Sequence, residues 1–255
     1  IASGLRGMTS NPTIFDKAIS SGSDYDTMIQ KLCSEGRSAF EIYDELTIKD
    51  IQDAADALME TYRQSSGLDG YISLEINPKL AYNTRDTLTE GKRLFEKVDR
   101  PNLMLKVPAT ENGFEAIEEL TASGMNVNAT LIFSLTQYTA TADAYIKGIE
   151  RLAASGGDVR KVRSVASVFV SRVDTAVDKL LGEAKTGLKG AAAVANCRMI
   201  YAKFLEFKQF KMKDMNLQRP LWASTSTKDP AYSDIKYVAE LIGKDTVNTL
   251  PGKYP

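Results

Sequence analysis

The sequence predicts an α/β fold with a parallel sheet, and three observations agree on this. Segments typical of strands and of helices alternate along the whole chain, the pattern of repeated β–α units. The composition, 43% hydrophobic and 25% charged residues, is that of a globular protein. No change of composition marks a linker in the 255 residues, a length that an α/β barrel often occupies as one domain. We therefore expect one (β/α)₈ TIM barrel domain over residues 1–255.

Seven segments have the character of strands. Each is a short run rich in apolar residues, and most are followed by a helical pattern. In order along the chain they span residues 4–10, 69–76, 102–109, 125–133, 162–172, 219–225 and 245–251.

Amphipathic patterns predict helices after most of these strands. Gly36 suits the end of the first one, and Asn112 with Glu115 and Ser134 with Gln137 have the spacing of N-terminal capping pairs. A long alanine-rich helix follows the fifth strand. The other predicted helices span residues 24–36, 47–64, 84–98, 112–124, 134–153 and 233–243.

Closure of the barrel needs an eighth strand, and no further segment of the chain provides one. The simplest solution is a first strand that precedes Ile1, so that the seven strands here are strands 2 to 8. The chain also stops after "LPGKYP" without a last helical pattern. We expect the first strand and the C-terminal helix to lie outside this sequence.

Charge and cysteine content narrow the class of protein. The net charge of -1, with no long run of one sign, gives no indication of a nucleic-acid or membrane partner. No apolar run approaches the roughly 20 residues of a membrane helix. The two cysteines, Cys33 and Cys197, are far apart and lie in helical patterns, as expected of a reduced, cytoplasmic protein. Nothing in the sequence indicates the oligomeric state.

The absence of histidine narrows the chemistry further. It excludes Ser-His and Cys-His nucleophiles and histidine-based metal sites. The glycine-rich phosphate loops GxGxxG and GxxxxGK are also absent. An enzyme with this composition must therefore take its acid–base groups mainly from Glu, Asp, Lys, Tyr or water.

Lys106 is the most unusual residue of the predicted strands, because "LMLKVP" places an amine in an apolar run. Burial of an unpaired ammonium group costs several kcal/mol, roughly. Lys106 therefore lies on an edge strand, pairs with a carboxylate, or loses its proton and reacts. A neutral amine attacks a ketone to form a Schiff base, which then acts as an electron sink for retro-aldol cleavage.

Other polar residues occur at the carboxyl ends of the strands, where catalytic groups of such barrels gather. A glutamate with a hydroxyl partner can hold the water that shuttles protons to the amine. Cationic and hydroxyl groups on the later strands can hold a phosphate. The residues concerned are Asn11, Ser73, Glu75, Asn126, Asn128, Thr130, Ser167, Arg172, Ser224 and Lys228.

Each of these residues has a simpler explanation when it is taken alone. Glu75 is then the salt-bridge partner of Lys106, and Thr130 is a residue that favours strands. Asn11 before a proline is typical of a turn. Arg172 is then one half of a surface pair with Asp174. The pattern by itself leaves these alternatives open.

Taken together, five segments resemble the transaldolase family, most closely its longer bacterial branch. They occur in the order of the family and extend over essentially the whole chain: "GMTSNPTIFDKAI", "LKVPAT", "NVNATLIFSLTQY", "SVASVFVSRVDTAVD" and "RPLWASTSTKDPAYSD". The resemblance implies a (β/α)₈ barrel enzyme of the pentose phosphate pathway that needs no cofactor. Its reaction moves a dihydroxyacetone unit from sedoheptulose 7-phosphate to glyceraldehyde 3-phosphate, giving erythrose 4-phosphate and fructose 6-phosphate.

The resemblance also implies roles, position by position. Lys106 is the Schiff-base lysine, and Glu75 and Thr130 hold the catalytic water. The residues that bind the ketose hydroxyls are Asn11, Asn128 and Ser167. Those that bind the phosphate are Arg172, Ser224 and Lys228. The implied partners are phosphorylated sugars.

One feature of the family is not found in this sequence. An Asp on the first strand of the family removes the proton from the hydroxyl at C4, and "GLRGMTSNP" corresponds to the second strand. We expect that Asp to precede Ile1. Two alternatives to a transaldolase remain open from the sequence: a related lysine aldolase, and a sugar-phosphate-binding barrel without catalysis.

Overall fold

The computed structural model describes residues 4–182, 186–209 and 212–250. Seven parallel strands form one sheet, in which each strand lies beside its neighbours in the sequence. They are β1 (Gly7–Thr9), β2 (Tyr71–Glu75), β3 (Leu103–Pro108), β4 (Val127–Ile132), β5 (Ser164–Phe169), β6 (Gln218–Ala223) and β7 (Val247–Asn248).

The sheet is curled but open. Within the described residues no strand pairing joins β1 to β7, so the fold is an α/β half-barrel and a closed eight-stranded barrel is not seen. All seven predicted strands are present, with shorter bounds than the patterns suggested. Pro251, at the end of the last predicted segment, lies outside the described residues.

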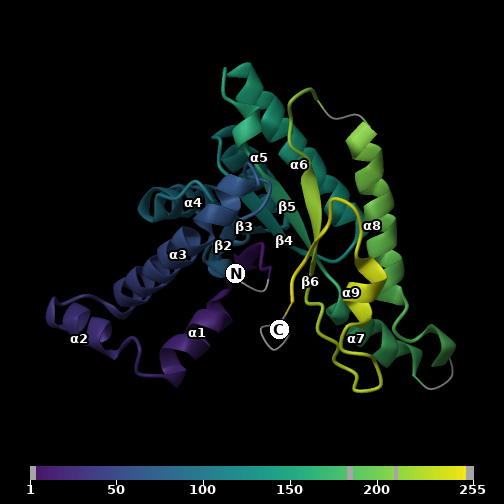
Figure 1. The fold of residues 1–255 in the computed structure, drawn as a ribbon, viewed down its shortest axis with the longest axis horizontal. Helices are drawn as coiled ribbons and strands as arrows, with labels where there is room; N and C mark the ends of the chain where they lie inside the picture. The colour runs from purple at the N-terminus through teal and green to yellow at the C-terminus, as the bar shows by residue number, and fades with distance from the viewer. Residues whose placement is uncertain (1–3, 183–185, 210–211, 251–255) are drawn as a thin grey trace.

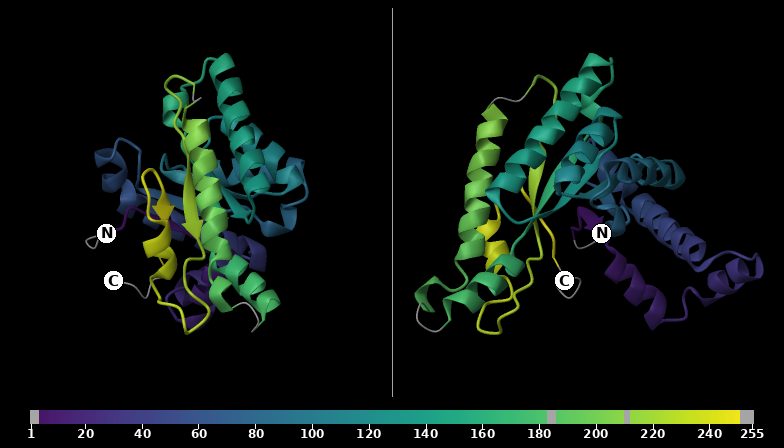
Figure 2. Two further views of the ribbon diagram at one scale, coloured as in Figure 1. Left: turned by 90° about the vertical axis from the view of Figure 1, so that its right-hand side faces the viewer. Right: turned by 180° about the vertical axis from the view of Figure 1, so that it is seen from behind.

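The helices lie on the outer side of the curled sheet, and α1 and α2 extend away from it (Figure 1, Figure 2). Short 3₁₀ turns occur at Pro78–Leu80, Val159–Lys161 and Thr186–Leu188. The α-helices are α1 (Pro12–Ser21), α2 (Asp26–Ser34), α3 (Ala39–Gln64), α4 (Thr84–Val98), α5 (Glu111–Ala122), α6 (Leu135–Ala154), α7 (Ser171–Leu181), α8 (Ala192–Gln209) and α9 (Lys236–Leu241).

Alternation along the strands separates two apolar clusters. Residues such as Leu105, Val107 and Ala129 belong to the large core between sheet and helices. The opposite face carries a smaller cluster that includes Met104 and Val165. This second face is the concave interior of the half-barrel. The predicted site residues of β2 to β5 point to this face, because along each strand they alternate with residues of the large core.

Several local predictions were wrong. The helix α1 was not predicted, because Asn11 and Pro12 were read as a turn; the Asn11 side chain instead caps α1 by accepting from the Ile14 amide at 3.0 Å. The N-cap of α5 is Thr110, whose hydroxyl accepts from the Gly113 amide at 3.0 Å. Asn112 lies inside that helix.

Other boundaries differ for equally local reasons. The helix α3 begins at Ala39, eight residues before the predicted start, because Ser38 and Glu41 form a capping box ahead of the apolar stripe. The alanine-rich helix is two helices, α7 and α8. Ser134 caps α6 as predicted, accepting from the Gln137 amide at 3.2 Å.

The cysteines are both free, and they differ in environment. Cys197 is fully buried in α8, where burial, with a smaller contribution from Asp174, raises the pKa of its thiol to about 12. Cys33 is exposed. In the part of the chain that the structure describes, no helix is both long and apolar enough to cross a membrane.

Candidate active site

The centre of the site is a row of side chains that crosses β2, β3 and β4 on one face of the sheet. Strand register aligns Glu75 with Lys106 and Lys106 with Asn128, so all three project from the same face. Lys106 is only 8% exposed. Its Nζ donates to Glu75 Oε2 at 3.1 Å and to the carbonyl oxygen of Ser10 at 3.3 Å. The amine therefore contacts Ser10, which follows β1, and Glu75, which is the last residue of β2.

These contacts decide between the simpler explanations of Lys106. The strand β3 has a partner on both sides, so the edge-strand explanation is wrong. The ion pair with Glu75 is confirmed. A carboxylate at this distance can also accept a proton from the amine, because general bases act within about 2.6–3.2 Å.

A chain of hydrogen bonds fixes the amide of Asn128. Its Nδ2 donates to Ser73 Oγ at 3.0 Å, and its Oδ1 accepts from Ser167 Oγ at 2.6 Å. All three side chains are buried. The orientation of the amide is therefore set by β2 on one side and by β5 on the other, directly beside Lys106.

Thr130 is the least satisfied polar residue of this face. It is 1% exposed, and none of the described residues forms a hydrogen bond with its Oγ1. It lies two positions beyond Asn128, where the pairing of β4 with β5 shifts register and Leu131 has a φ of 61°. A buried hydroxyl without a partner costs about 1–3 kcal/mol, so this atom is a natural contact for a ligand or water.

Arg172 is exposed at the end of β5, in the first turn of α7. Its guanidinium lies 4.7 Å from the centroid of the Phe169 ring, and it forms no ion pair within the described residues. The explanation as a surface pair with Asp174 is wrong, because Asp174 is buried and accepts from the Ala193 amide and the Tyr237 hydroxyl. The charge of Arg172 is therefore free for an anion.

The end of β6 lies against the start of α7. The Ser171 amide donates to the Ser224 carbonyl at 3.0 Å, and the two hydroxyl oxygens are 2.9 Å apart. Ser224 has a φ of 56°, an uncommon backbone conformation for a residue other than glycine. The N-cap of α7, Val170, provides no side-chain cap. The Ser171 and Val173 amides of this first turn are already used by the carbonyls of Ser224 and Val170. The helix N-terminus still places a partial positive charge beside Ser224 and Arg172.

The remaining predicted residues lie at the rim. Asn11 caps α1 through its Oδ1, and none of the described residues accepts a hydrogen bond from its Nδ2. Lys228 is exposed in the segment after β6 and donates to Ser226 Oγ at 2.8 Å. Among the described residues, no hydrogen bond or ion pair joins the side chain of either residue to the Lys106 row.

The structure thus brings the predicted residues together in two groups, and it adds others. Glu75, Lys106, Asn128, Thr130 and Ser167 line one face, whereas Arg172 and Ser224 meet through Ser171. Sequence reasoning gave no role to Ser171 or Phe169, and Ser73 was noted only for its place on the face. "FVSR" is the only signal for the first two, since it places a hydroxyl beside the exit arginine.

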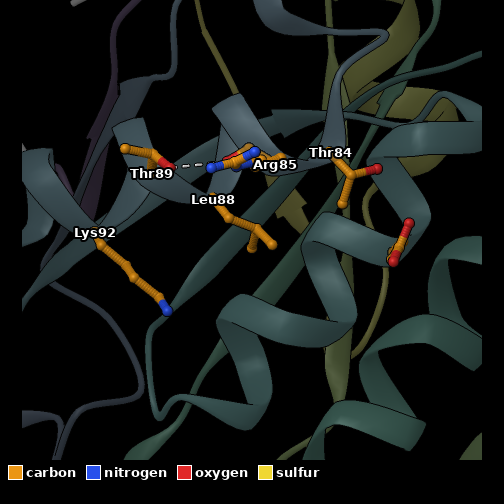
Figure 3. Close-up of a pocket in the computed structure, with 6 residues that line it drawn as sticks. Thr84, Arg85, Leu88, Thr89 and Lys92 are labelled. Atoms are coloured by element: carbon orange, nitrogen blue, oxygen red, sulfur yellow. Dashed lines mark hydrogen bonds between the residues drawn. The ribbon is translucent and has the colours of Figure 1, made fainter.

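Hollows on the outer surface lie apart from this site. One of about 340 Å³ is lined by α4 and α5 residues, and its Thr89 hydroxyl donates to the Arg85 carbonyl (Figure 3). No predicted site residue lines it. Among the described residues, no group of three or more His, Cys, Asp or Glu side chains is arranged to hold a metal ion.

Comparison with known proteins gives a consistent picture. The sequence profile of the transaldolase/fructose-6-phosphate aldolase family matches residues 1–254. A transaldolase of Saccharopolyspora erythraea is 48% identical over 253 residues, which cover 96% of this chain and 69% of that protein. Transaldolases of Trichodesmium erythraeum and Thiobacillus denitrificans are each 45% identical, over 97% and 98% of this chain and 70% and 72% of their own lengths.

Proposed function

The chain belongs to the transaldolase/fructose-6-phosphate aldolase family, and on that basis we propose that it transfers a dihydroxyacetone unit between sugar phosphates. The donor is sedoheptulose 7-phosphate and the acceptor is glyceraldehyde 3-phosphate, giving erythrose 4-phosphate and fructose 6-phosphate in the pentose phosphate pathway. The observation that carries this proposal is the buried amine of Lys106, held at 3.1 Å from Glu75.

Lys106 is the nucleophile of the proposed reaction. Its neutral amine attacks the ketone carbon of the donor, and loss of water from the adduct gives an iminium ion. Cleavage of the bond between C3 and C4 then sends its electron pair into the iminium, which becomes an enamine. The C4 hydroxyl gives its proton to a base, in the family an Asp of the first strand, as the aldehyde product leaves, and the same base returns the proton to the acceptor oxygen when the new bond forms. The enamine attacks the carbonyl carbon of the acceptor, and hydrolysis of the new iminium releases the product and the amine.

Glu75 and Thr130 serve the proton transfers of the imine. The carboxylate of Glu75 lies beside the amine, and the hydroxyl of Thr130 is buried without a partner among the described residues. Lys106 lies between the strands that carry these two residues. A water held by both groups would supply and remove protons as the adduct forms and breaks.

Asn11, Asn128 and Ser167 bind the hydroxyls of the ketose. The fixed amide of Asn128 supports this role, because a preorganised group loses little entropy when the substrate arrives. Ser167 Oγ, a donor to Asn128, can still accept from a sugar hydroxyl. Asn11 contributes its Nδ2 from the rim.

Arg172, Ser224 and Lys228 bind the phosphate. The guanidinium provides a planar pair of donors that suits a phosphate, and the N-terminus of α7 adds the partial positive charge of the helix in the same place. Lys228 approaches from the segment after β6 as a second charge. Phosphorylated sugars are the only partners this site needs.

The fold required for this chemistry is a (β/α)₈ barrel in one domain. The seven parallel strands in sequential order support this proposal, as does the gathering of the polar groups at their carboxyl ends. We assign them as strands 2 to 8. The iminium of Lys106 is itself the electron sink, so the chemistry calls for no cofactor. The free cysteines suit a cytoplasmic location.

Imine trapping tests the proposal directly. The full-length protein is incubated with fructose 6-phosphate and borohydride, which reduces an imine to a stable adduct, and its intact mass is measured. We expect one adduct in the wild type, with the added mass of dihydroxyacetone less one water and plus two hydrogens, and none in Lys106→Ala. Lys92→Ala, which removes an exposed lysine of α4, is the matched control and keeps the adduct.

A turnover assay with and without an acceptor separates the two enzyme alternatives, and the trapping experiment tests the third. Turnover that requires an aldose acceptor identifies a transaldolase, whereas release of the three-carbon fragment without an acceptor identifies a lysine aldolase. Binding of fructose 6-phosphate with no adduct would overturn the Schiff-base assignment and leave a sugar-phosphate-binding barrel.

A further inference from the structure

Two aspartates one helical turn apart connect α7 to the segment after β6. Asp174 accepts from the Ala193 amide at 2.7 Å and from the Tyr237 hydroxyl at 2.8 Å. Asp178 accepts from the Gly190 amide at 2.9 Å and from the Tyr232 hydroxyl at 2.8 Å. Figure 1 shows α7, α9 and the segment between β6 and α9 close together at the lower right.

Tyr232 lies in the segment that carries two of the proposed phosphate-binding residues. That segment runs from Ser224 to Ile235, has no strand or helix, and includes Lys228. Near the sheet it is joined to α7 by the Ser171–Ser224 contacts. The hydrogen bond from Tyr232 to Asp178 is a second attachment, two helical turns farther along α7.

The fit around Tyr232 is close. A Cβ atom added at Gly190 would lie 2.8 Å from Cζ of the Tyr232 ring, which is too short for an unstrained contact. The Lys236 ammonium lies 5.5 Å from the centroid of the same ring. Burial and the Asp178 carboxylate raise the pKa of the Tyr232 hydroxyl above its ordinary value, so it stays protonated and donates.

We propose that the Asp178–Tyr232 hydrogen bond positions the segment of Ser224 and Lys228 against the α7 terminus that carries Arg172, and so sets the preference for phosphorylated ketoses. This inference rests on the proposed function. Ser224 and the buried Thr225, whose hydroxyl donates to the Thr249 carbonyl, hold the start of the segment, and Tyr232 holds it beyond Lys228. Lys228 therefore lies between two attachments, and loss of the Tyr232 hydrogen bond removes the one on its far side. Tyr232 touches no reacting atom, so it is a positioning residue, and its loss affects binding of the phosphate and spares the imine chemistry.

Tyr232→Phe tests this, because it removes the hydroxyl and keeps the ring. We expect the KM for fructose 6-phosphate to rise by about fivefold or more, the scale of losing one hydrogen bond to a charged acceptor, with kcat within twofold. Borohydride trapping of unphosphorylated dihydroxyacetone on Lys106 stays at the wild-type rate, and the affinity for inorganic phosphate falls in parallel with the KM change. Tyr201→Phe, which loses a hydroxyl bond to the Lys244 carbonyl away from the site, is the matched control and changes none of these values.

Gly190→Ala provides a second approach to the same contact. The added methyl group displaces the Tyr232 ring and should raise the KM for fructose 6-phosphate as Tyr232→Phe does. An alanine at Gly190 also strains the backbone, because the φ of this residue is 70°. Gly124→Ala is the control for this strain, since Gly124 has a similar φ of 81° and an added Cβ would contact no other atom there. Comparable melting temperatures in the two variants exclude general destabilisation as the cause.

The outcomes are distinct for the two proposals. An unchanged KM and phosphate affinity in Tyr232→Phe, with wild-type trapping intact, overturns the positioning role and leaves the proposed function standing. Equal losses for dihydroxyacetone trapping and for fructose 6-phosphate also overturn it, since they indicate a general structural role. Absence of trapping in the wild type defeats the proposed function; weaker phosphate binding in Tyr232→Phe alone would still support the contact.

Discussion

The two ends of the concave face differ in how their polar groups are bonded. At the amino ends of the strands, Arg163 donates to the carbonyls of Gly67 and Ser66 at 2.8 and 3.3 Å. Arg219 donates to the carbonyl of Leu68 at 2.8 Å and pairs with Asp69. These two cations reach from β5 and β6 to the segment that precedes β2, and they join elements far apart in the sequence.

At the carboxyl ends, polar groups retain capacity for further bonds. The hydroxyl of Thr130 has no partner among the described residues, and the guanidinium of Arg172 contacts an aromatic ring instead of a carboxylate. The Lys106 amine donates to the Glu75 carboxylate and to the Ser10 carbonyl, which leaves one of its three donors for another partner. This end of the face therefore has hydrogen-bonding groups that can bind a ligand.

The comparison shows why a cation on the concave face does not by itself identify a functional site. Arg163 and Lys106 are both cations of the same face, yet one joins two loops and the other has bonding capacity left for a ligand. In barrels of this type the amino end contributes stability and the carboxyl end contributes catalysis. Variants at the two ends should therefore separate turnover from stability.

Glu75→Gln is expected to have the largest effect. The amide can still accept from Lys106 but cannot take a proton, so kcat should fall by about 10²- to 10⁴-fold, while the melting temperature changes little. Steady-state kinetics with fructose 6-phosphate and erythrose 4-phosphate measure this. Glu115→Gln, an exposed carboxylate of α5, is the control with wild-type kcat. A kcat within threefold of wild type in Glu75→Gln would remove Glu75 from the mechanism.

Thr130→Val sharpens the comparison, because activity and stability should change in opposite directions. Removal of the unpartnered hydroxyl should lower kcat by about tenfold to a hundredfold if it holds the catalytic water. The free energy of unfolding should stay level or rise by about 1 kcal/mol, since a buried polar atom without a partner is replaced by a methyl group. Chemical denaturation measures the second effect, and a clear loss of stability would show that the hydroxyl has an internal role.

Arg163→Met addresses the other end of the face. The bonds to Gly67 and Ser66 are lost and their carbonyls are left without the guanidinium, so the free energy of unfolding should fall by about 2 kcal/mol. At a temperature where the variant is folded, kcat and KM should match the wild type. A selective loss of turnover would break the distinction between the two ends.

The order of the strands and the face that carries the site could be predicted from the sequence. Alternation in "YISLEINP" and "NVNATLIF" places Glu75, Asn128 and Thr130 on one face, and the parallel order of the strands sets them beside Lys106. Such information is local, because each residue's side of the sheet depends on its own strand. The face of each side chain can therefore be predicted from the sequence without knowledge of the tertiary structure.

Contacts that depend on the relative position of two elements could not be predicted. The role of Ser171 requires the end of β6 to lie against α7, and "FVSR" gives no sign of it. The same holds for Asp174, which was paired with Arg172 by proximity in sequence but faces the interior toward Tyr237. Helix starts were missed where a cap competes with a turn, as at Asn11.

Tyr71→Phe should have the smallest effect and a distinctive dependence on pH. Tyr71 lies at the amino end, where its hydroxyl donates to the Gly67 carbonyl at 2.9 Å, and burial chiefly, with nearby Tyr62, raises its pKa above the ordinary value. The fold thus favours the protonated phenol, whose contribution is fully present below the unfolded pKa of about 10 and is lost as the pH rises through the folded value.

The stability difference between the wild type and Tyr71→Phe should therefore be constant from pH 7 to 9 and shift by about 1 kcal/mol in favour of the variant between pH 10 and 11. Urea denaturation across this range measures it. A difference that stays constant to pH 11 would mean that the folded and unfolded phenols titrate together. Since Tyr71 shares its acceptor with Arg163, such a result would also weaken the view that the polar groups at the amino end mainly bind one another.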